Sequence, residues 1–259
     1  MLIFSVIIYL AVTIFIGLYA ARRVHVAKDY LIAGRSLPLY MNVATVFATW
    51  FGAEVVLSIS ATFARDGLNG VVGDPFGASL CLIMAALFFA RIFYRLNLLT
   101  IGDFYKVRYG KAVEVLTSST VVISYLGWTS AQFTALGLII HVLTGGAVQF
   151  NHGIMIGAAV VLVYTVFGGM WSVAFTDLLQ TIVILIGLLI IGWMAGEHAG
   201  GIEAVVAHAS ASGKFDMFPA TMDATAWWAM AGAFFAFAFG SIPQQDVFQR
   251  MTSAKNEDT

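Results

Sequence analysis

The sequence predicts an all-α protein that crosses a membrane several times. Hydrophobic residues make up 60% of its 259 residues and charged residues only 10%, whereas soluble domains carry roughly one quarter charged residues. The mean hydropathy is +0.90. A helix satisfies its backbone amides internally, as a chain surrounded by hydrocarbon requires. Several apolar stretches reach the length of about 20 residues that a helix needs to cross a bilayer.

Seven of these stretches are expected to form spans within a single transmembrane domain, 1–259. The first is not interpreted as a signal peptide, because Arg22 and Arg23 follow it and no basic residue precedes it. A polar external loop, 197–223, is expected to contain a short helix near Ile202–Ala207, and a cytoplasmic tail, 243–259, follows the last span. The expected spans are 2–21, 39–64, 75–96, 113–142, 153–167, 174–195 and 224–242.

The few charges predict how the protein is oriented. Lys and Arg total 13 and Asp and Glu total 14, which gives a net charge of −1 and no basic excess for binding nucleic acid. Of the basic residues, 11 lie in the loops that follow odd-numbered spans or in the last turns that lead into those loops. Cytoplasmic loops carry the excess of Lys and Arg. The protein is therefore expected in the plasma or inner membrane, with its N-terminus outside and its C-terminus in the cytoplasm.

No motif indicates an enzyme. Cys81 is the single cysteine, which excludes an intrachain disulfide and a Cys-rich metal cage. The histidines show no spacing typical of a transition-metal site, and no glycine pattern of a nucleotide-binding loop occurs. No nucleophile stands beside a plausible base in the sequence. We therefore expect neither catalysis nor an organic cofactor.

Two of the spans carry residues that interrupt helices. The expected span 39–64 contains Gly52 and the ionisable Glu54, and an acidic residue at mid-membrane costs about 2.5–3.5 kcal/mol. Glu54 is interpreted either as functional or as a protonated or hydrogen-bonded packing residue. The last span contains Gly240, and Pro243 follows its expected end directly. Pro243 either breaks the helix within the membrane or ends it at the interface.

The two interrupted spans resemble each other in sequence. Phe47–Gly52 matches Phe235–Gly240 in its pattern of aromatic and small residues. They lie five spans apart, and an odd spacing gives two copies opposite orientations across the membrane. Interrupted helices at matching positions of inverted repeats point to the binding site of a transporter.

Two further polar positions are open to two interpretations each. Gln132, near Trp128, either lines a solute pathway or bonds to a neighbouring helix. Asp177 follows Thr176, and together they either cap the helix start of span 174–195 or place a carboxylate on the inward path of a cation.

Four segments carry a resemblance to a known family: Ala48–Glu54, the loop 99–109, the stretch 168–180 with its Gly-Gly turn and Thr-Asp-x-x-Gln, and the closing stretch 241–250. On these segments the chain resembles the sodium:solute symporter family. The resemblance implies a LeuT-like inverted-repeat fold with one extra N-terminal helix. Family members are about twice as long, so the chain is expected to be truncated after seven spans.

The resemblance also implies a function and a site. The function would be sodium-coupled symport of a small polar organic solute by alternating access, with the sodium ion, the solute and the lipid bilayer as partners. The alternative is a solute-sensing module fused to a histidine kinase. An anionic Glu54 favours a cationic solute. Sodium would bind to main-chain carbonyls of Ala48 and Phe51, and Asp177 would take part in sodium release. Substrate contacts would come from Trp50, Glu54, Gln132, Phe237, Phe239 and Ser241.

Overall fold

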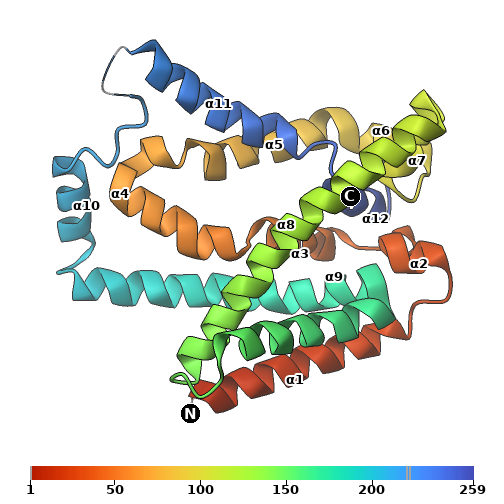
Figure 1. Ribbon diagram of the computed structural model, residues 1–259, viewed down its shortest axis with the longest axis horizontal. Coiled ribbons are helices and arrows are strands. Elements are labelled where there is room, and N and C mark those ends of the chain that lie inside the picture. Colours follow the sequence, from red (N-terminus) through yellow and green to blue (C-terminus); the bar gives the residue numbers. More distant parts are fainter. Residues whose placement is uncertain (1, 220, 222) are drawn as a thin grey trace. The chain divides into compact units, whose positions relative to one another are not determined.

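The computed structural model describes residues 2–219, 221 and 223–259 and is 82% helical (Figure 1). In the first part of the chain, the helical elements are α1 (Leu2–Ala21), α2 (Ala27–Ile32), η1 (Ala33–Arg35), α3 (Leu39–Trp50), η2 (Glu54–Ile59), α4 (Ser60–Gly70), η3 (Val72–Gly77), α5 (Ala78–Met84), η4 (Ala85–Phe89) and α6 (Ala90–Leu96). The second part contains α7 (Ile101–Tyr109), α8 (Lys111–Leu143), α9 (Phe150–His198), α10 (Ile202–Ala211), α11 (Ala224–Gly240) and α12 (Gln245–Ser253).

The chain forms two compact units. Unit 1 comprises residues Met1–Ala53, Ala90–Leu179 and Gln245–Thr259, and unit 2 comprises Glu54–Phe89 and Gln180–Gln244. Among the described residues, four helices are long and apolar enough to cross a membrane, and two broken pairs, α3 with η2–α4 and α11 with α12, reach that length when each pair is taken as one span. The break expected at Gly52 is confirmed, because α3 ends at Trp50 and the next helical turn begins only at Glu54.

In unit 1, small residues allow long helices to approach one another closely. A Cβ added to Gly17 of α1 would lie 2.6 Å from the Cβ of Tyr164 in α9, and the Ser172 hydroxyl donates to the Gly17 carbonyl. Helix α8 crosses α9 at a second such contact, where a Cβ on Gly153 would lie 2.8 Å from the carbonyl oxygen of Gly137. Close approach through glycine is a common way to pack helices in membranes, where apolar burial does not drive association.

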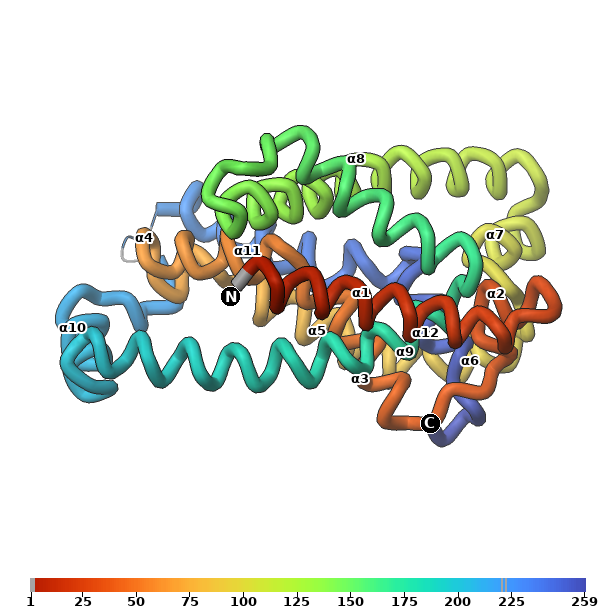
Figure 2. The backbone as a smooth tube through the Cα atoms, turned by 90° about the horizontal axis from the view of Figure 1, so that it is seen from below, coloured from red at the N-terminus to blue at the C-terminus, as the bar shows by residue number. Residues whose placement is uncertain are grey.

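A sharp turn divides α9 into two arms. Gly169 has φ 49° and ψ −137°, and the chain reverses direction between the arms (Figure 1 and Figure 2). A Cβ at Gly169 would lie only 2.4 Å from the carbonyl oxygen of Tyr30, so glycine is required both by the dihedral angles and by the close approach.

The second arm begins earlier than the sequence predicts, which changes the interpretation of Thr176 and Asp177. Both residues lie inside the helix rather than at its start. The Thr176 hydroxyl donates to the carbonyls of Ser172 and Val173, at 3.0 Å each, instead of accepting from an amide. The capping interpretation is therefore wrong, because the turn that starts the arm is made by Gly169.

Helix α12 lies in the stretch 243–259 that the sequence suggests is a tail. Val247 is buried and Phe248 has no exposed surface, and the Phe248 ring lies 5.4 Å from the ring of Phe93 in α6, centroid to centroid. The amide of Leu37 donates to the Ser253 carbonyl at 3.1 Å, and the amide of Lys255 donates to the Leu37 carbonyl at 2.9 Å. Polar residues make this segment too hydrophilic to stand out as a span, yet its apolar side chains are packed into unit 1.

The segment 99–109, expected as a loop, forms helix α7. Its start is a reciprocal cap. The Thr100 hydroxyl accepts from the Asp103 amide at 3.1 Å, and the Asp103 carboxylate accepts from the Thr100 amide at 2.9 Å. The Gln245 side chain of α12 satisfies one more amide, that of Ile101, at 2.8 Å. The Thr-x-x-Asp spacing is the signal from which this helix could have been predicted.

In unit 2, α11 packs against η3 and α5 through two glycines. A Cβ at Gly73 would lie 2.8 Å from Cδ2 of Phe237, and a Cβ at Gly77 would lie 2.6 Å from the Phe234 carbonyl oxygen. The absence of side chains at Gly73 and Gly77 therefore creates the groove into which α11 fits.

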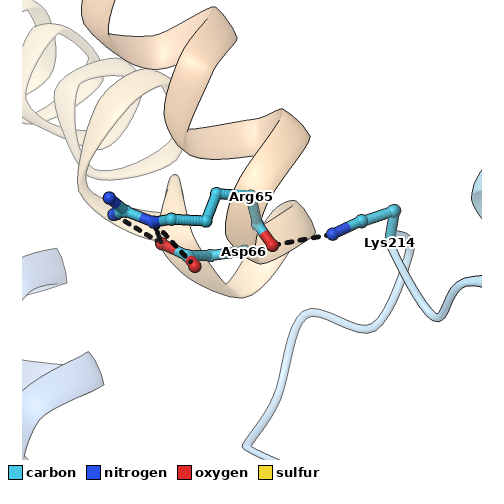
Figure 3. Close-up of polar contacts among 3 residues, drawn as sticks. All are labelled: Arg65, Asp66 and Lys214. Carbon is cyan, nitrogen blue, oxygen red and sulfur yellow. Dashed lines mark hydrogen bonds and ion pairs between the residues drawn. The ribbon is translucent and has the colours of Figure 1, made fainter.

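The loop that follows α10 is fastened to the end of α4 (Figure 3). The Lys214 ammonium donates to the carbonyl of Arg65 at 2.7 Å, and the Leu68 amide donates to the carbonyl of Lys214 at 2.8 Å. Gly67 lies beneath this contact with φ 68°. The Asn69 side chain adds a bond to the Met217 carbonyl at 2.9 Å. Helix α10 lies where the sequence predicts a short helix.

The turn in α9 yields a stability prediction. Gly169→Ala should destabilise the protein by about 2 kcal/mol or more, because a left-handed backbone costs about 1–3 kcal/mol in a residue with a side chain and the new methyl group meets the Tyr30 carbonyl. Thermal unfolding in detergent, followed by gel-filtration recovery, measures this loss. Gly187→Ala in the same helix is the control, because nothing lies within 4 Å of its added Cβ. Equal recovery of the two variants would contradict the assignment.

Candidate functional site

A cavity of about 340 Å³ lies in unit 1, beside the point where α3 ends. Its walls come from four helices that are distant in sequence. The lining residues are Ala48, Thr49, Phe51, Gly52, Trp128, Gln132, Asp177, Asp246 and Arg250.

Helix α3 unwinds at residues that line this cavity. The amide of Phe51 donates to the Phe47 carbonyl at 2.9 Å, and Phe51 itself has φ −92° and ψ 73°, outside the helical range. The last four carbonyls of a helix have no amide in the next turn to accept from. The carbonyls of residues 48–51 therefore have no amide in a next turn of α3, and three of these residues, Ala48, Thr49 and Phe51, line the cavity. Hard cations bind such oxygens.

On the C-terminal side of the break, the Gln132 side chain of α8 is the hydrogen-bond acceptor for a main-chain amide. Its Oε1 atom accepts a hydrogen bond from the Ala53 amide at 3.0 Å. Ala53 directly precedes the next helical turn, and the first amides of a helix lack internal acceptors. A side chain 79 residues away in sequence thus takes the place of a cap and holds the unwound segment open.

Two carboxylates line the cavity, and their environments differ. The Asp246 carboxylate accepts a hydrogen bond from the Tyr125 hydroxyl at 2.7 Å. The main-chain amide of Asp246 donates to the hydroxyl oxygen of Tyr125 at 3.0 Å. Asp177 is 8% exposed, and its Oδ2 atom is buried without a hydrogen-bond partner among the described residues. A buried carboxylate without partners is costly, so Asp177 is the stronger candidate to bind a cation.

The structure brings together only part of the site that the sequence predicts. Ala48, Phe51, Gln132 and Asp177 line the cavity. Trp50 lies on α3 of the same unit but is not a lining residue. The remaining predicted residues, which are Glu54, Phe237, Phe239 and Ser241, belong to unit 2.

Within unit 2, two of these residues have packing contacts. The Phe237 ring lies against Gly73, and the Phe239 ring stacks on Phe235 with a centroid distance of 5.7 Å. Both side chains are also 45% exposed. Packing by one part of each ring leaves another part accessible.

Sequence reasoning assigned no role to Asp246 and Arg250, which line the cavity from α12. They are four residues apart, and this spacing places two side chains on one face of a helix. The spacing could have indicated a shared surface. It carried little weight because the segment was expected to be a tail rather than a helix.

The side chains do not form a conventional metal centre. In the part of the chain that the structure describes, no group of three His, Cys, Asp or Glu side chains is placed to hold a metal ion. Cation binding here would use main-chain carbonyls together with a single carboxylate, which suits a weakly held alkali ion better than a transition metal.

A helix that unwinds beside a cavity with charged side chains in its wall, in an apolar helical bundle, is typical of membrane transporters. The family model of the sodium:solute symporter family matches residues 30–259. The chain belongs to this family, whose members are transporters rather than enzymes, and it is a multi-pass membrane protein.

Comparison with individual proteins agrees with the family. The chain is 26% identical over 263 residues to high-affinity choline transporter 1 of Drosophila melanogaster, covering 97% of this chain and 40% of that protein. It is 27% identical to the human high affinity choline transporter 1, and the match covers 97% of this chain and 44% of that protein. It is also 27% identical to the sodium/glucose cotransporter of Vibrio parahaemolyticus, and that match covers 81% of this chain and 40% of that protein. The chain thus spans less than half the length of these relatives.

A solved structure confirms the LeuT-like fold. A Na+-coupled sialic acid symporter, in a substrate-bound outward-open state, matches with a TM-score of 0.87 at 21% identity. The match covers 100% of this chain and 55% of that protein.

The bond from Ala53 to Gln132 predicts a local effect of mutation. Gln132→Leu should speed hydrogen exchange in a peptide covering 47–57 by about tenfold or more, because an unsatisfied buried amide costs about 1–3 kcal/mol. Hydrogen–deuterium exchange with mass spectrometry measures this. Thr134→Ala is the control, since that exposed hydroxyl bonds only within α8, to the Ser130 carbonyl. Unchanged exchange in Gln132→Leu would show that the side chain does not hold the break.

Proposed function

We propose that the protein is a sodium-coupled symporter that moves a small polar organic solute across the cell membrane by alternating access. The observation that carries the proposal is the break in α3, where residues at the end of the helix line the same cavity as Asp177, whose buried Oδ2 atom has no hydrogen-bond partner among the described residues. Family membership supports sodium as the coupling ion. Sodium would bind to the carbonyls of Ala48 and Phe51 with electrostatic help from the Asp177 carboxylate in the same cavity, and Asp177 would also take part in its release.

The proposed solute is a small organic cation such as choline. Several of the relatives are choline transporters. The Trp128 side chain lines the cavity, and its ring meets that of Tyr125 edge to face with a centroid distance of 6.3 Å. Aromatic faces attract quaternary ammonium groups. Trp50, Glu54, Gln132, Phe237, Phe239 and Ser241 are proposed to contact the solute, with Glu54 as the compensating negative charge.

The proposed orientation places the N-terminus outside and the C-terminus in the cytoplasm. It is supported by the uneven distribution of basic residues along the sequence. In this orientation the inward sodium gradient drives uptake. Each positive charge that enters releases about 2.3 kcal/mol of free energy per 100 mV of membrane potential.

Ion replacement tests the coupling. Choline uptake should be measured in proteoliposomes that contain the protein expressed from its complete reading frame. Replacing external Na+ by K+ at constant osmolarity should reduce the initial rate at least tenfold, because the empty sodium site no longer supports solute binding.

Liposomes without protein give the background rate. A panel of unlabelled competitors, including glucose, proline and a monocarboxylate, separates the solute from the coupling ion. Sodium-driven uptake of another solute would show that choline is not the substrate, but it would leave the proposal of sodium-coupled symport intact. Uptake that is indifferent to Na+ for every solute would overturn sodium coupling.

A further inference from the structure

Arg250 places a positive charge in the same cavity as the candidate cation site. It lies on α12 and lines the cavity together with Asp177 and Asp246. Its Nε atom is buried and has no hydrogen-bond partner among the residues described. Asp177 likewise has a buried oxygen without a partner. A guanidinium and a carboxylate thus border one cavity, each incompletely satisfied.

The two groups do not form a closed ion pair. The ion pairs found in the described part of the chain are Arg65 with Asp66, Arg95 with Glu257 and Lys111 with Glu114. Removal of opposite charges from water is compensated only by close pairing or by a polar occupant. An open arrangement of this kind leaves room for a cation beside Asp177, with Arg250 close enough to oppose its binding electrostatically.

The backbone that carries Arg250 is held in place. The first turn of α12 is fixed by the bond from the Ile101 amide to Gln245 and by the bonds between Asp246 and Tyr125. Further along the helix, Phe248 is fully buried and the Gln249 side chain donates to the Leu31 carbonyl. With the helix anchored, the flexible stem of Arg250 confines its charge to the cavity.

Asp246 provides a second negative charge on the same face of α12, four residues before Arg250. The guanidinium therefore has two carboxylates bordering its cavity, one on its own helix and one on α9. A cation that occupies the position beside Asp177 repels the guanidinium toward Asp246. When the cation leaves, the guanidinium is the charge available to neutralise Asp177.

We propose that Arg250 is a tethered counter-charge that lowers the affinity of the cavity for the coupling cation and promotes release of that cation. This inference rests on the proposed function. It adds a residue that adjusts ion affinity to the carbonyls and carboxylate proposed as the binding groups. Arg250 acts through Asp177 and is a positioning residue rather than a ligand.

The test measures the sodium concentration that gives half-maximal solute uptake in proteoliposomes. Arg250→Gln should lower this concentration about tenfold, because no guanidinium then competes with the cation for the Asp177 carboxylate, and it should also lower the maximal rate because release slows. Arg250→Lys keeps the charge and should remain close to the wild type. Arg95→Gln is the matched control, because its guanidinium pairs with Glu257 at the surface.

If Arg250 had only a structural role, its replacement would change the half-maximal sodium concentration in the opposite direction. Damage to the cavity would raise the half-maximal sodium concentration, and that result, or no change, would overturn the proposal. Sodium-induced thermal stabilisation in detergent gives a second readout that needs no transport. The double variant Asp177→Asn with Arg250→Gln should show no further gain in affinity over Asp177→Asn alone.

The outcomes distinguish this inference from the proposed function. If wild-type uptake does not depend on sodium, symport itself fails. If wild-type uptake depends on sodium and Arg250→Gln binds it no more tightly, only the role of Arg250 fails. If Arg250→Gln does not fold, Arg250→Met, which keeps an apolar stem and removes the charge, takes its place in the single and the double variant with the same expected results. Weakened sodium affinity in Arg250→Lys, or an intact Arg250 effect in the Asp177→Asn background, would overturn the proposal.

Discussion

The cost of leaving polar groups unpaired inside an apolar bundle is the constraint on which this structure depends. In a continuous membrane helix, each carbonyl accepts a hydrogen bond from an amide of the next turn. Helix α3 instead ends at Trp50. An unsatisfied backbone group in hydrocarbon costs several kcal/mol. The break is tolerated because Gln132 satisfies the amide at Ala53 and because the residues at the end of α3 border a cavity that charged side chains also line. A cation that replaces the missing amides would reduce the remaining cost, which connects the broken helix to ion binding.

The rest of unit 1 supports this arrangement. Glycine contacts bring α1, α8 and α9 close together, and the turn at Gly169 starts the arm that carries Asp177. Helix α12 is held at its start by α7 and α8 and at its end by the backbone bonds to Leu37. The α8, α9 and α12 walls of the cavity therefore each have contacts outside it.

Much of the fold could be predicted from the sequence because the relevant signals are local. Apolar length indicated the long helices, and Gly52 within an apolar stretch indicated the break. The start of the second arm of α9 was misplaced because Thr176 and Asp177 resemble a cap. The positive φ that starts this arm depends on the contact between Gly169 and Tyr30, which the sequence does not display.

The candidate site was harder to predict for the same reason. Ala48, Phe51, Gln132 and Asp177 were identified from membrane-depth polarity and from the family resemblance. Asp246 and Arg250 were assigned no role because α12 is short and polar, and its burial comes from contacts with distant segments. The bond between Gln132 and Ala53 joins residues 79 positions apart, and no local pattern indicates which of two plausible partners a membrane glutamine selects.

Equilibrium binding of radioactive ²²Na+ to the purified protein in detergent, without solute, tests the central claim most directly. That claim is that a cation binds at the carbonyls of the α3 break with help from Asp177. The account predicts saturable binding that non-radioactive Na+ displaces and K+ does not, with affinity at least tenfold weaker in Asp177→Asn. The exposed tail variant Asp258→Asn should bind as the wild type does. Absence of saturable binding, or equal binding by wild type and Asp177→Asn, would contradict the account.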